Sequence, residues 1–445
     1  MERWLDEQRI LDVECLVPDM TGIPRGRSVA RAKLMDAPSL RLPEAVLGMT
    51  VTGAYPSDDS AYSRAISAAQ RDMLLRPDPS TVTRVPWAAD HTAQVLLDCH
   101  FADGQPVDFA PRSVLRRVLG LYAAKGWRAQ VAPELEFYLT ARSGDPNIPL
   151  RAPVGRSGRA ETSRQIYSID AVNEFDPLFE CLYDYCERME IDAVTLIHEI
   201  GAGQMGIDFL PGEPLAMADT VVLFKRAVRE VALRHGMHAT FMAKPMMDEP
   251  GSAMHLHQTV FDAGTGGNLF TLDDGAPSPV FHHYLGGLQR YMPAAMALGA
   301  PYVNSYRRIV RGSLAPINVQ WGVDNRTVGF RIPPTAPHER HIENRVIGAD
   351  ANPYLALAAT LACGYLGMVE KIEPGAATIG SAHALDFELP ESLPQALRSL
   401  RADDRLCALL GERFVDVFCA IKEHEYMEFM TVISPWEREH LLLHV

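Results

Sequence analysis

The chain has 445 residues, of which 47% are hydrophobic, and this is enough to bury the core of one large domain and a smaller one. Its 42 basic and 56 acidic residues give a formal net charge of −14, which argues against nucleic-acid binding, because phosphate backbones are bound by clustered positive charge. The composition therefore favours a soluble enzyme or binding protein that acts on small molecules.

The amino-terminal segment 1–17 is charged from its second residue and lacks the continuous apolar stretch of a secretory signal. No apolar run approaches the roughly 20 residues that a membrane span needs, so no membrane partner is expected. The seven cysteines form no CxxC pair and are predicted to be reduced thiols. Together these features predict a cytoplasmic location.

Residues 11–34 are predicted to form a strand, a turn and a second strand, because alternating segments flank a turn rich in Pro and Gly. The acidic pair Asp58 and Asp59 follows in a polar loop; it either lines an amine entrance or is simply solvated. We place a small domain at residues 1–105, closed by the turn-rich segment FADGQPVDFAP, and a large domain at 106–445.

Two helices are predicted next. The first begins near Pro111 and ends before Gly126, and its apolar residues recur at helical spacing. The second covers PLAMADTVVLFKRAVREVALRHG, with Glu213 before it and Gly236 after it, as the helix dipole and capping preferences favour.

Short segments of alternating polarity lie around and after these helices. In a strand, alternate side chains share a face, so each segment presents polar residues to one surface and apolar residues to the other. The pattern predicts an α+β fold with an open sheet that has a polar concave face and helices behind it. The segments are 131–139, 195–200, 203–210, 252–260, 325–333 and 341–346.

Polar residues on these strands suggest a metal site. Glu134 and Glu136 share a face of one strand, and two carboxylates about 7 Å apart repel unless positive charge lies beside them. One such pair can be a solvated strand face, and a lone histidine is usually structural. Sites rich in oxygen with an occasional imidazole suit Mg²⁺ or Mn²⁺ better than zinc. Similar residues recur on the other segments, namely Glu199, His255, His257 and Glu343.

Arginines are dense in the same part of the chain. Any one of them can pair with a structural acid, but arginines among metal-binding carboxylates are what phosphoryl transfer requires, because charge developing on phosphate oxygens must be stabilised. For the set we favour phosphate and carboxylate binding. The set comprises Arg307, Arg308, Arg326, Arg331 and Arg345.

The ordered motifs PELEF, HEIGAGQ, GSAMHLHQ, NSYRR, DNRTVGFRIP and IENR resemble the glutamine synthetase family over roughly residues 10–445. Within it, PDMTGIPRGRSVAR and APINVQWGVDNRT resemble the γ-glutamylpolyamine synthetase branch, which couples glutamate to polyamines or other amines. The resemblance implies a small β-grasp-like amino-terminal domain and a catalytic domain with a curved antiparallel sheet, a half-barrel. It also implies a homo-oligomer of stacked hexameric rings, a dodecamer.

The resemblance further implies ATP and two or three Mg²⁺ or Mn²⁺ ions as cofactors, with glutamate and an amine as substrates joined through γ-glutamyl phosphate. Residue by residue, it assigns the metal nearer the nucleotide to Glu134, His255 and Glu343, and the metal nearer glutamate to Glu136 and Glu199. It assigns ATP phosphates to Arg331, the transferring phosphoryl group to Arg326, nucleotide contacts to His257 and Thr259, and glutamate or its acyl phosphate to Gly251, Arg308 and Arg345.

Two departures from the family pattern favour an organic amine over ammonia. The ammonia-using enzymes carry a glutamate in the flap loop that follows NSYRR, whereas this chain has Leu314, which offers apolar contact to a methylene-bearing amine. Pro250 replaces an asparagine that contacts glutamate, a change that the polyamine branch shares. No counterpart of the family's adenylylated tyrosine loop is found before ALDFELPESL, so no such regulation is expected.

Gly206 is the third departure, because the family usually has a glutamate there that completes the glutamate-side metal site. Asp208, two residues on, faces the same side of the strand but has a shorter reach. Two readings stay open: a working ligase, for a polyamine or another small amine such as ethanolamine, or an inactive or regulatory homologue with an incomplete metal site.

Overall fold

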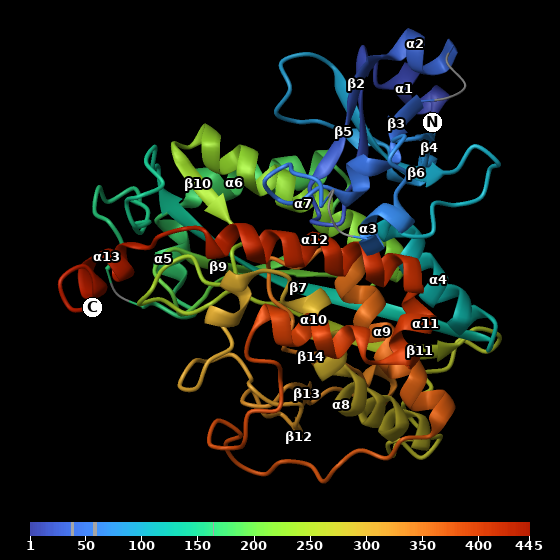
Figure 1. Cartoon of the computed structure of the whole chain (residues 1–445), viewed down its shortest axis with the longest axis vertical. Helices are drawn as coiled ribbons and strands as arrows, with labels where there is room; N and C mark the ends of the chain where they lie inside the picture. Colours follow the sequence, from blue (N-terminus) through green and yellow to red (C-terminus); the bar gives the residue numbers. More distant parts are fainter. Residues whose placement is uncertain (37–39, 57–59, 163) are drawn as a thin grey trace.

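The computed structural model describes residues 1–36, 40–56, 60–162 and 164–445. Within these residues two sheets are built in succession along the chain, the first at the top right of Figure 1 and the second through the body of the molecule. The predicted acidic pair Asp58 and Asp59 lies outside the described residues.

The first sheet has the strand order β2-β1-β6-β4-β3, with β5 paired to β6. Strand β1 pairs antiparallel with β2 and parallel with β6, as in a β-grasp arrangement. Its strands are β1 (Asp12–Pro18), β2 (Pro24–Ala30), β3 (Leu40–Pro43), β4 (Asp72–Pro77), β5 (Thr83–Arg84) and β6 (Thr92–His100), and its helices are α1 (Glu2–Glu7), α2 (Arg31–Asp36) and α3 (Ser60–Ala65).

The second sheet has the order β12-β13-β14-β11-β7-β9-β8, with β10 paired to β7. It is curved and backed by helices, and its pairs are antiparallel except that β12 runs parallel to β13. Its strands are β7 (Trp127–Ala141), β8 (Ala193–His198), β9 (Gln204–Phe209), β10 (Met237–Thr240), β11 (Met254–Asp262), β12 (Trp321–Val323), β13 (Phe330–Ile332) and β14 (Ile342–Asn344).

Helices cover the outer face of the second sheet and build the core behind it. Helix α9 is apolar on all sides and packs on α8, α4 and α7, as expected of a helix at the centre of a core. It is long and apolar enough to cross a membrane, but 83% of that stretch is buried inside the protein. The helices are α4 (Pro111–Ala123), α5 (Ile169–Asn173), α6 (Asp176–Arg188), α7 (Pro214–Arg234), α8 (Pro279–Gly299), α9 (Pro353–Glu370), α10 (Leu393–Arg401), α11 (Asp404–Leu410), α12 (Glu412–Met430) and α13 (Pro435–Leu441).

A buried arginine joins the two sheets. Arg112, in the first turn of α4, lies 2.6 Å from Asp78, which follows β4, and 3.0 Å from Asp98 on β6. Its third contact, at 2.7 Å, is with Asp219 on α7. A guanidinium presents five donors in a rigid fork, so one buried side chain can hold three carboxylates from separate elements. This ion-pair cluster anchors the first sheet against the helices behind the second.

The predicted hairpin and both predicted helices are present, with local differences. The second strand of the hairpin ends at Ala30, and Arg31–Asp36 forms a short helix instead, in keeping with the helix preference of Ala, Lys, Leu and Met. Strand β6 ends at His100 and α4 begins at Pro111. The boundary near residue 105 falls between them and stays a prediction.

Candidate active site

The predicted metal-binding residues lie on neighbouring strands and share one face of the second sheet. Strand β7 is central: Glu134 is opposite His255 of β11 on one side and Asp208 of β9 on the other. Glu343 of β14 is opposite His257 of β11. Residues directly opposite one another in a ladder project to the same side. The alternation in sequence therefore converges on one polar patch.

The side chains of this patch are within coordinating distance of one another. His255 Nδ1 lies 3.2 Å from Glu134 Oε1 and 3.7 Å from Glu343 Oε1. His255 Nε2 lies 4.0 Å from Glu136 Oε1, and His257 Nε2 lies 3.5 Å from Glu134 Oε2. Two triads, Glu134–Glu136–His255 and Glu134–His257–Glu343, each place one ligand atom per residue within 4.8 Å of the others.

The electrostatics of the patch fit a cation. Burial, with the nearby charges of Glu136 and Glu134, raises the pKa of Glu199 to about 9. Burial and the charge of Glu134 raise the pKa of Asp208 to about 6. Crowded carboxylates shift in this way when positive charge between them is insufficient. Oxygen ligands with an imidazole are the donor set that Mg²⁺ or Mn²⁺ accepts, so the residues present fit such an ion.

Two of the predicted arginines contact the patch directly. Arg331 on β13 lies 2.9 Å from Glu343 and 2.7 Å from Asp324. Arg345 forms an ion pair with the other oxygen of Glu343. Both guanidinium groups are thus held at the edge of the carboxylates, where an anionic substrate would meet them.

Arg308 and Gly251 form a second, adjoining group. Arg308 is buried, and its guanidinium donates hydrogen bonds of 2.9 Å to the carbonyl oxygens of Arg345 and Val346. A Cβ at Gly251 would lie 2.6 Å from both Arg308 Cγ and the Ala243 carbonyl oxygen, so only glycine fits. Arg308 therefore holds the backbone on which Arg345 is placed.

Two other predicted residues, Arg326 and Thr259, make their contacts outside the carboxylate patch. The Arg326 side chain is 62% exposed, and its nearest acid, Asp324, is 4.0 Å away. Thr259 lies on the same strand as His255 and His257, but its hydroxyl donates to the Arg340 carbonyl at 3.1 Å. Neither side chain hydrogen-bonds or pairs with a carboxylate of the patch among the described residues.

Glu199 follows β8 directly, and its carboxylate occupies space beside Gly206. A Cβ at Gly206 would lie 2.7 Å from Glu199 Oε1 and 3.0 Å from Ile197 Cγ1. Gly206 is opposite Glu136, whereas Asp208 is opposite Glu134, about 7 Å further along β9. Asp208 therefore lies at the Glu134 end of the patch, whereas Gly206 lies beside Glu136.

Sequence reasoning missed the residues that support these ligands. His198 is fully buried, and its Nε2 lies 2.9 Å from Glu161, whose other oxygen accepts from the Gly203 amide at 2.6 Å. Gln204 donates to Glu136 Oε2 at 3.1 Å and to the Gly251 carbonyl at 3.1 Å. Glu161 sits in a segment without periodicity, so no local pattern pointed to it. Gln204 was visible as a polar residue at the start of β9.

The two loop departures differ in exposure, because Leu314 is exposed and Pro250 is half-buried. Leu314 is 51% exposed in the loop that follows Arg308. Pro250 precedes Gly251, and its carbonyl accepts a 2.8 Å hydrogen bond from the Tyr138 hydroxyl. The loop after Arg308 thus offers an apolar side chain, Leu314, to solvent.

The sequence matches a known family over most of its length. The model of the glutamine synthetase catalytic domain matches residues 108–441. Gamma-glutamylputrescine synthetase PuuA of Escherichia coli (strain K12) is 34% identical, over 97% of this chain and 91% of its own length. Glutamine synthetase of Pyrococcus abyssi (strain GE5 / Orsay) is 32% identical, over 96% of this chain and 92% of its own length.

Solved structures agree in fold. Apo GmaS without ligand superposes with a TM-score of 0.85 at 28% identity, covering 100% of this chain and 99% of that chain. A GmaS/ADP complex gives a TM-score of 0.84 at 28% identity, covering 99% of both chains.

Proposed function

Because this chain belongs to the glutamine synthetase family and is an ATP-dependent ligase, we propose that it joins the γ-carboxylate of glutamate to an organic amine, a polyamine such as putrescine or spermidine. The observation that carries the choice of amine is Leu314, which is 51% exposed where the ammonia-using enzymes have a carboxylate. An apolar side chain stabilises the methylenes of an organic amine and gives nothing to ammonium.

The reaction has two steps. A γ-carboxylate oxygen of glutamate attacks the γ-phosphorus of ATP, ADP leaves, and γ-glutamyl phosphate forms. The amine nitrogen then attacks the acyl carbon, phosphate leaves with the bonding electron pair, and the nitrogen loses a proton. Mg²⁺ or Mn²⁺, held by Glu134, His255 and Glu343 and by Glu136 and Glu199, would supply charge that offsets the repulsion between ATP and a carboxylate.

The protein groups orient the reactants around this charge. Arg331, which already pairs with Glu343, is suited to bind ATP phosphates, and Arg345 to bind the acidic substrate. The buried Arg308 acts through the backbone of Arg345 and, with Gly251, forms the wall on the glutamate side. We assign nucleotide contacts to His257 and Thr259, and phosphoryl stabilisation to Arg326, which is free to turn inward because it is exposed.

The assembly and location are part of the same proposal. We propose a dodecamer of stacked hexameric rings, as in the family. Exposed apolar side chains on and after α12 and α13, including Met430, Val432, Ile433 and Leu443, support contact with further copies. We place the protein in the cytoplasm, which its free cysteines support.

Gly206 favours a second candidate, a homologue with an incomplete glutamate-side metal site that binds ATP without transferring a γ-glutamyl group. The absence of a side chain there removes one carboxylate from that site. A third possibility keeps the chemistry and uses another amine, such as ethanolamine or a monoamine.

The experiment is phosphate release with ATP, glutamate and millimolar Mg²⁺ or Mn²⁺ against putrescine, spermidine, ethanolamine, methylamine and ammonium. A Glu343→Gln variant serves as the control for background hydrolysis. Turnover that requires an organic amine supports the ligase. ATP binding with no amine-dependent turnover in any arm would overturn it in favour of the second candidate.

A further inference from the structure

Gln204 lies at the centre of a hydrogen-bond network between the predicted metal ligands and the predicted glutamate site. It begins β9 and is 2% exposed. In the ladder it is opposite Tyr138 of β7, so both side chains project to the face that carries the carboxylate patch. Because a buried amide is costly unless it is hydrogen-bonded, its partners show which parts of the site it joins.

The side-chain amide of Gln204 joins Glu136 to the backbone at Gly251. Its Nε2 donates 3.1 Å hydrogen bonds to Glu136 Oε2 and to the Gly251 carbonyl oxygen. Its Oε1 accepts from the Gly201 amide at 3.0 Å. An ionised carboxylate and a carbonyl only accept hydrogen bonds, and a backbone amide only donates, so these partners fix which end of the side chain carries the nitrogen. Glutamine meets all three demands, whereas an ionised glutamate or a methionine of similar size would not.

The segment after Gly251 closes the network on the same carboxylate oxygen. The Ala253 amide donates to Glu136 Oε2 at 2.8 Å, and the Glu136 amide donates to the Ala253 carbonyl at 2.9 Å. Oε2 thus has two donors, one directly from this segment and one from Gln204. This leaves Oε1 for an ion, and Oε1 is the atom that lies 4.0 Å from His255 Nε2. Movement of Glu136 on ion binding is therefore passed to the backbone at Gly251.

The backbone of Gln204 reaches the other predicted glutamate-side ligand. The Glu199 amide donates to the Gln204 carbonyl at 2.8 Å, and the Gln204 amide donates to the Gly201 carbonyl at 2.9 Å. These bonds close the β8–β9 turn on which Glu199 is placed. A Cβ at Gly201 would overlap with the Tyr138 hydroxyl and lie 2.8 Å from Gln204 Oε1, so the turn packs directly against the amide. Both predicted glutamate-side ligands are thus tied to one residue.

Tyr138 extends the network to the loop before Gly251. Its hydroxyl donates to the Pro250 carbonyl at 2.8 Å and lies 3.2 Å from Gln204 Oε1. Gly251 is therefore held on two sides, at its own carbonyl by Gln204 and at the preceding carbonyl by Tyr138. Because glycine has more accessible backbone conformations than other residues, these two bonds restrict it where the proposed function has it meet glutamate.

We propose that Gln204 is a positioning residue that couples a divalent ion at Glu136 and Glu199 to glutamate at Gly251, so that each ligand strengthens the binding of the other. The inference rests on the proposed function, which assigns the ion and glutamate to these residues. It goes further than that function, because two ligands can bind at neighbouring sites without any link through the protein. Coupling of this kind is reciprocal and typically changes affinity by about 5- to 150-fold.

The test measures glutamate binding by calorimetry on the purified full-length assembly, without divalent ion and with saturating Mn²⁺, and with neither ATP nor amine present. The ratio of the two dissociation constants is the coupling factor, and in the wild type we expect a factor of about five or more. Gln204→Met keeps the length of the side chain and removes its hydrogen bonds, so the factor should fall by about threefold or more. Any direct contact between Mn²⁺ and glutamate survives this change, so the part of the coupling that is lost belongs to Gln204.

Gln258→Met is the matched control. Gln258 is a second buried glutamine of the same sheet, 1% exposed on β11, and its amide contacts Thr360 of α9 at 3.1 Å and Tyr284 of α8 at 2.7 Å, behind the sheet. Loss of these bonds should lower the melting temperature, as in Gln204→Met, and leave the coupling factor unchanged. Tyr138→Phe is a milder variant that removes one hydroxyl, and it should lower the factor about twofold. If Gln204→Met does not fold, Tyr138→Phe decides the question.

A merely structural role for Gln204 would weaken glutamate binding equally with and without Mn²⁺, so the factor would not change. That result would overturn the proposal. So would an equal fall of the factor in Gln258→Met, a wild-type affinity for glutamate that does not depend on Mn²⁺, or no glutamate binding in the presence of Mn²⁺.

The reciprocal arm measures Mn²⁺ affinity with and without saturating glutamate, from the spectrum of free Mn²⁺. It should give the same factor, because the linkage is symmetric. If the coupling depends on Gln204 while no amine yields a γ-glutamyl product, the proposed function fails and the coupling stands. If a product forms while the factor is unchanged in Gln204→Met, the coupling fails and the proposed function stands.

Discussion

Adding one methyl group at Gly206 tests whether this glycine is a gap or a fitted position. In Gly206→Ala the new Cβ would lie 2.7 Å from Glu199 Oε1 and 3.0 Å from Ile197 Cγ1, both closer than normal contacts. The backbone of Gly206 does not have a positive φ, so the strain is confined to side chains. Because Glu199 is flexible at its end, the fold should lose only about 1 kcal/mol.

The larger effect is expected on metal binding. Moving Glu199 away from Glu136 disturbs the glutamate-side ligands, and changes of this kind next to a metal cost about 10- to 100-fold in affinity. We therefore expect Gly206→Ala to weaken Mn²⁺ binding about tenfold, measured from the spectrum of free Mn²⁺, with a small change in melting temperature. Gly120→Ala is the control, because a Cβ there meets nothing within 4 Å.

Gly206→Glu extends the test. If Glu199 already fills the space beside residue 206, a glutamate at 206 adds a second negative charge there. Burial and the charge of Glu136 already raise the pKa of Glu199 to about 9, so the added repulsion should lower turnover. Unchanged or tighter Mn²⁺ binding in Gly206→Ala, or increased turnover in Gly206→Glu, would refute this reasoning and indicate an incomplete site.

Three further predictions concern the amine, the buried lysine and the anchoring arginine. Leu314→Glu should shift the ratio of kcat/KM values for putrescine and ammonium toward ammonium by about tenfold or more, and an unchanged ratio would remove Leu314 from amine selection. Lys225 has a folded pKa of about 7, below its unfolded value of about 10.4, so the unfolded state binds more protons between these values and stability should rise with pH there. Chemical denaturation of wild type and Lys225→Met from pH 6.5 to 10 should show this rise only in the wild type, and parallel curves would contradict it. Arg112→Met leaves the buried Asp219 without its cation, while Arg116 still pairs with Asp78 and Asp98, and it should cost about 3–5 kcal/mol of unfolding free energy. A loss below about 1 kcal/mol would mean that the Arg112 ion pairs do not anchor the first sheet.

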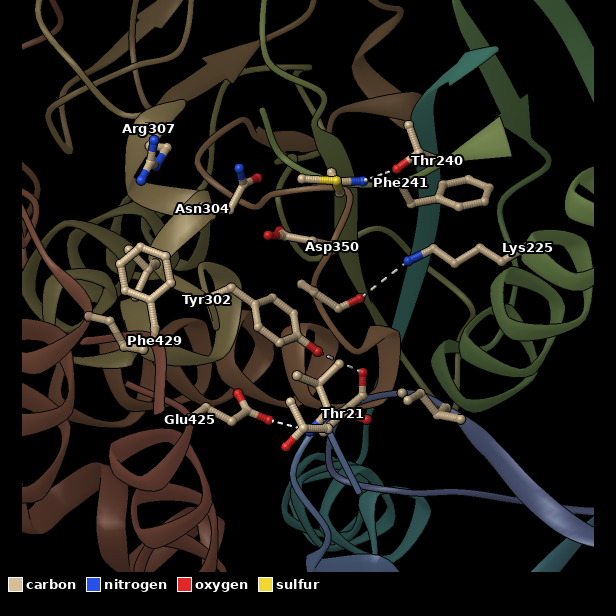
Figure 2. A pocket seen from close by; sticks show the side chains of 18 of the residues that line it. Thr21, Lys225, Thr240, Phe241, Tyr302, Asn304, Arg307, Asp350, Glu425 and Phe429 are labelled. Carbon is tan, nitrogen blue, oxygen red and sulfur yellow. Dashed lines mark hydrogen bonds between the residues drawn. The ribbon is translucent and has the colours of Figure 1, made fainter. Parts of the chain in front are cut away.

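Alternation along single strands predicts which face each carboxylate and histidine of the patch occupies, but not which strands are neighbours. Glu134, His255 and Glu343 each occupy a position whose face is set by the pleat, so their meeting required only that the strands be neighbours. The cavity of about 840 Å³ that is lined by the β1–β2 turn, α7, β10, α12 and the 3-10 helix Val303–Arg307 (Figure 2) had no such signal, because these segments meet only through tertiary packing. The Glu161–His198 contact was hidden for the same reason.

Long-range geometry also separates Gly206 from Asp208. From sequence the two positions share a face, and Asp208 was a possible substitute for the missing carboxylate. Strand pairing places Asp208 opposite Glu134 and Gly206 opposite Glu136. The register between β7 and β9 decides which end of the patch each residue faces, and the sequence of one strand alone does not specify that register.

The most direct test of the account is mass-spectrometric identification of the product formed from ATP, glutamate and an equimolar mixture of putrescine, spermidine, ethanolamine, methylamine and ammonium. The account predicts a γ-glutamyl amide of an organic amine, with the polyamine products most abundant, formed together with ADP and phosphate. Glutamine as the main product, or no γ-glutamyl product while ATP still binds, would contradict it.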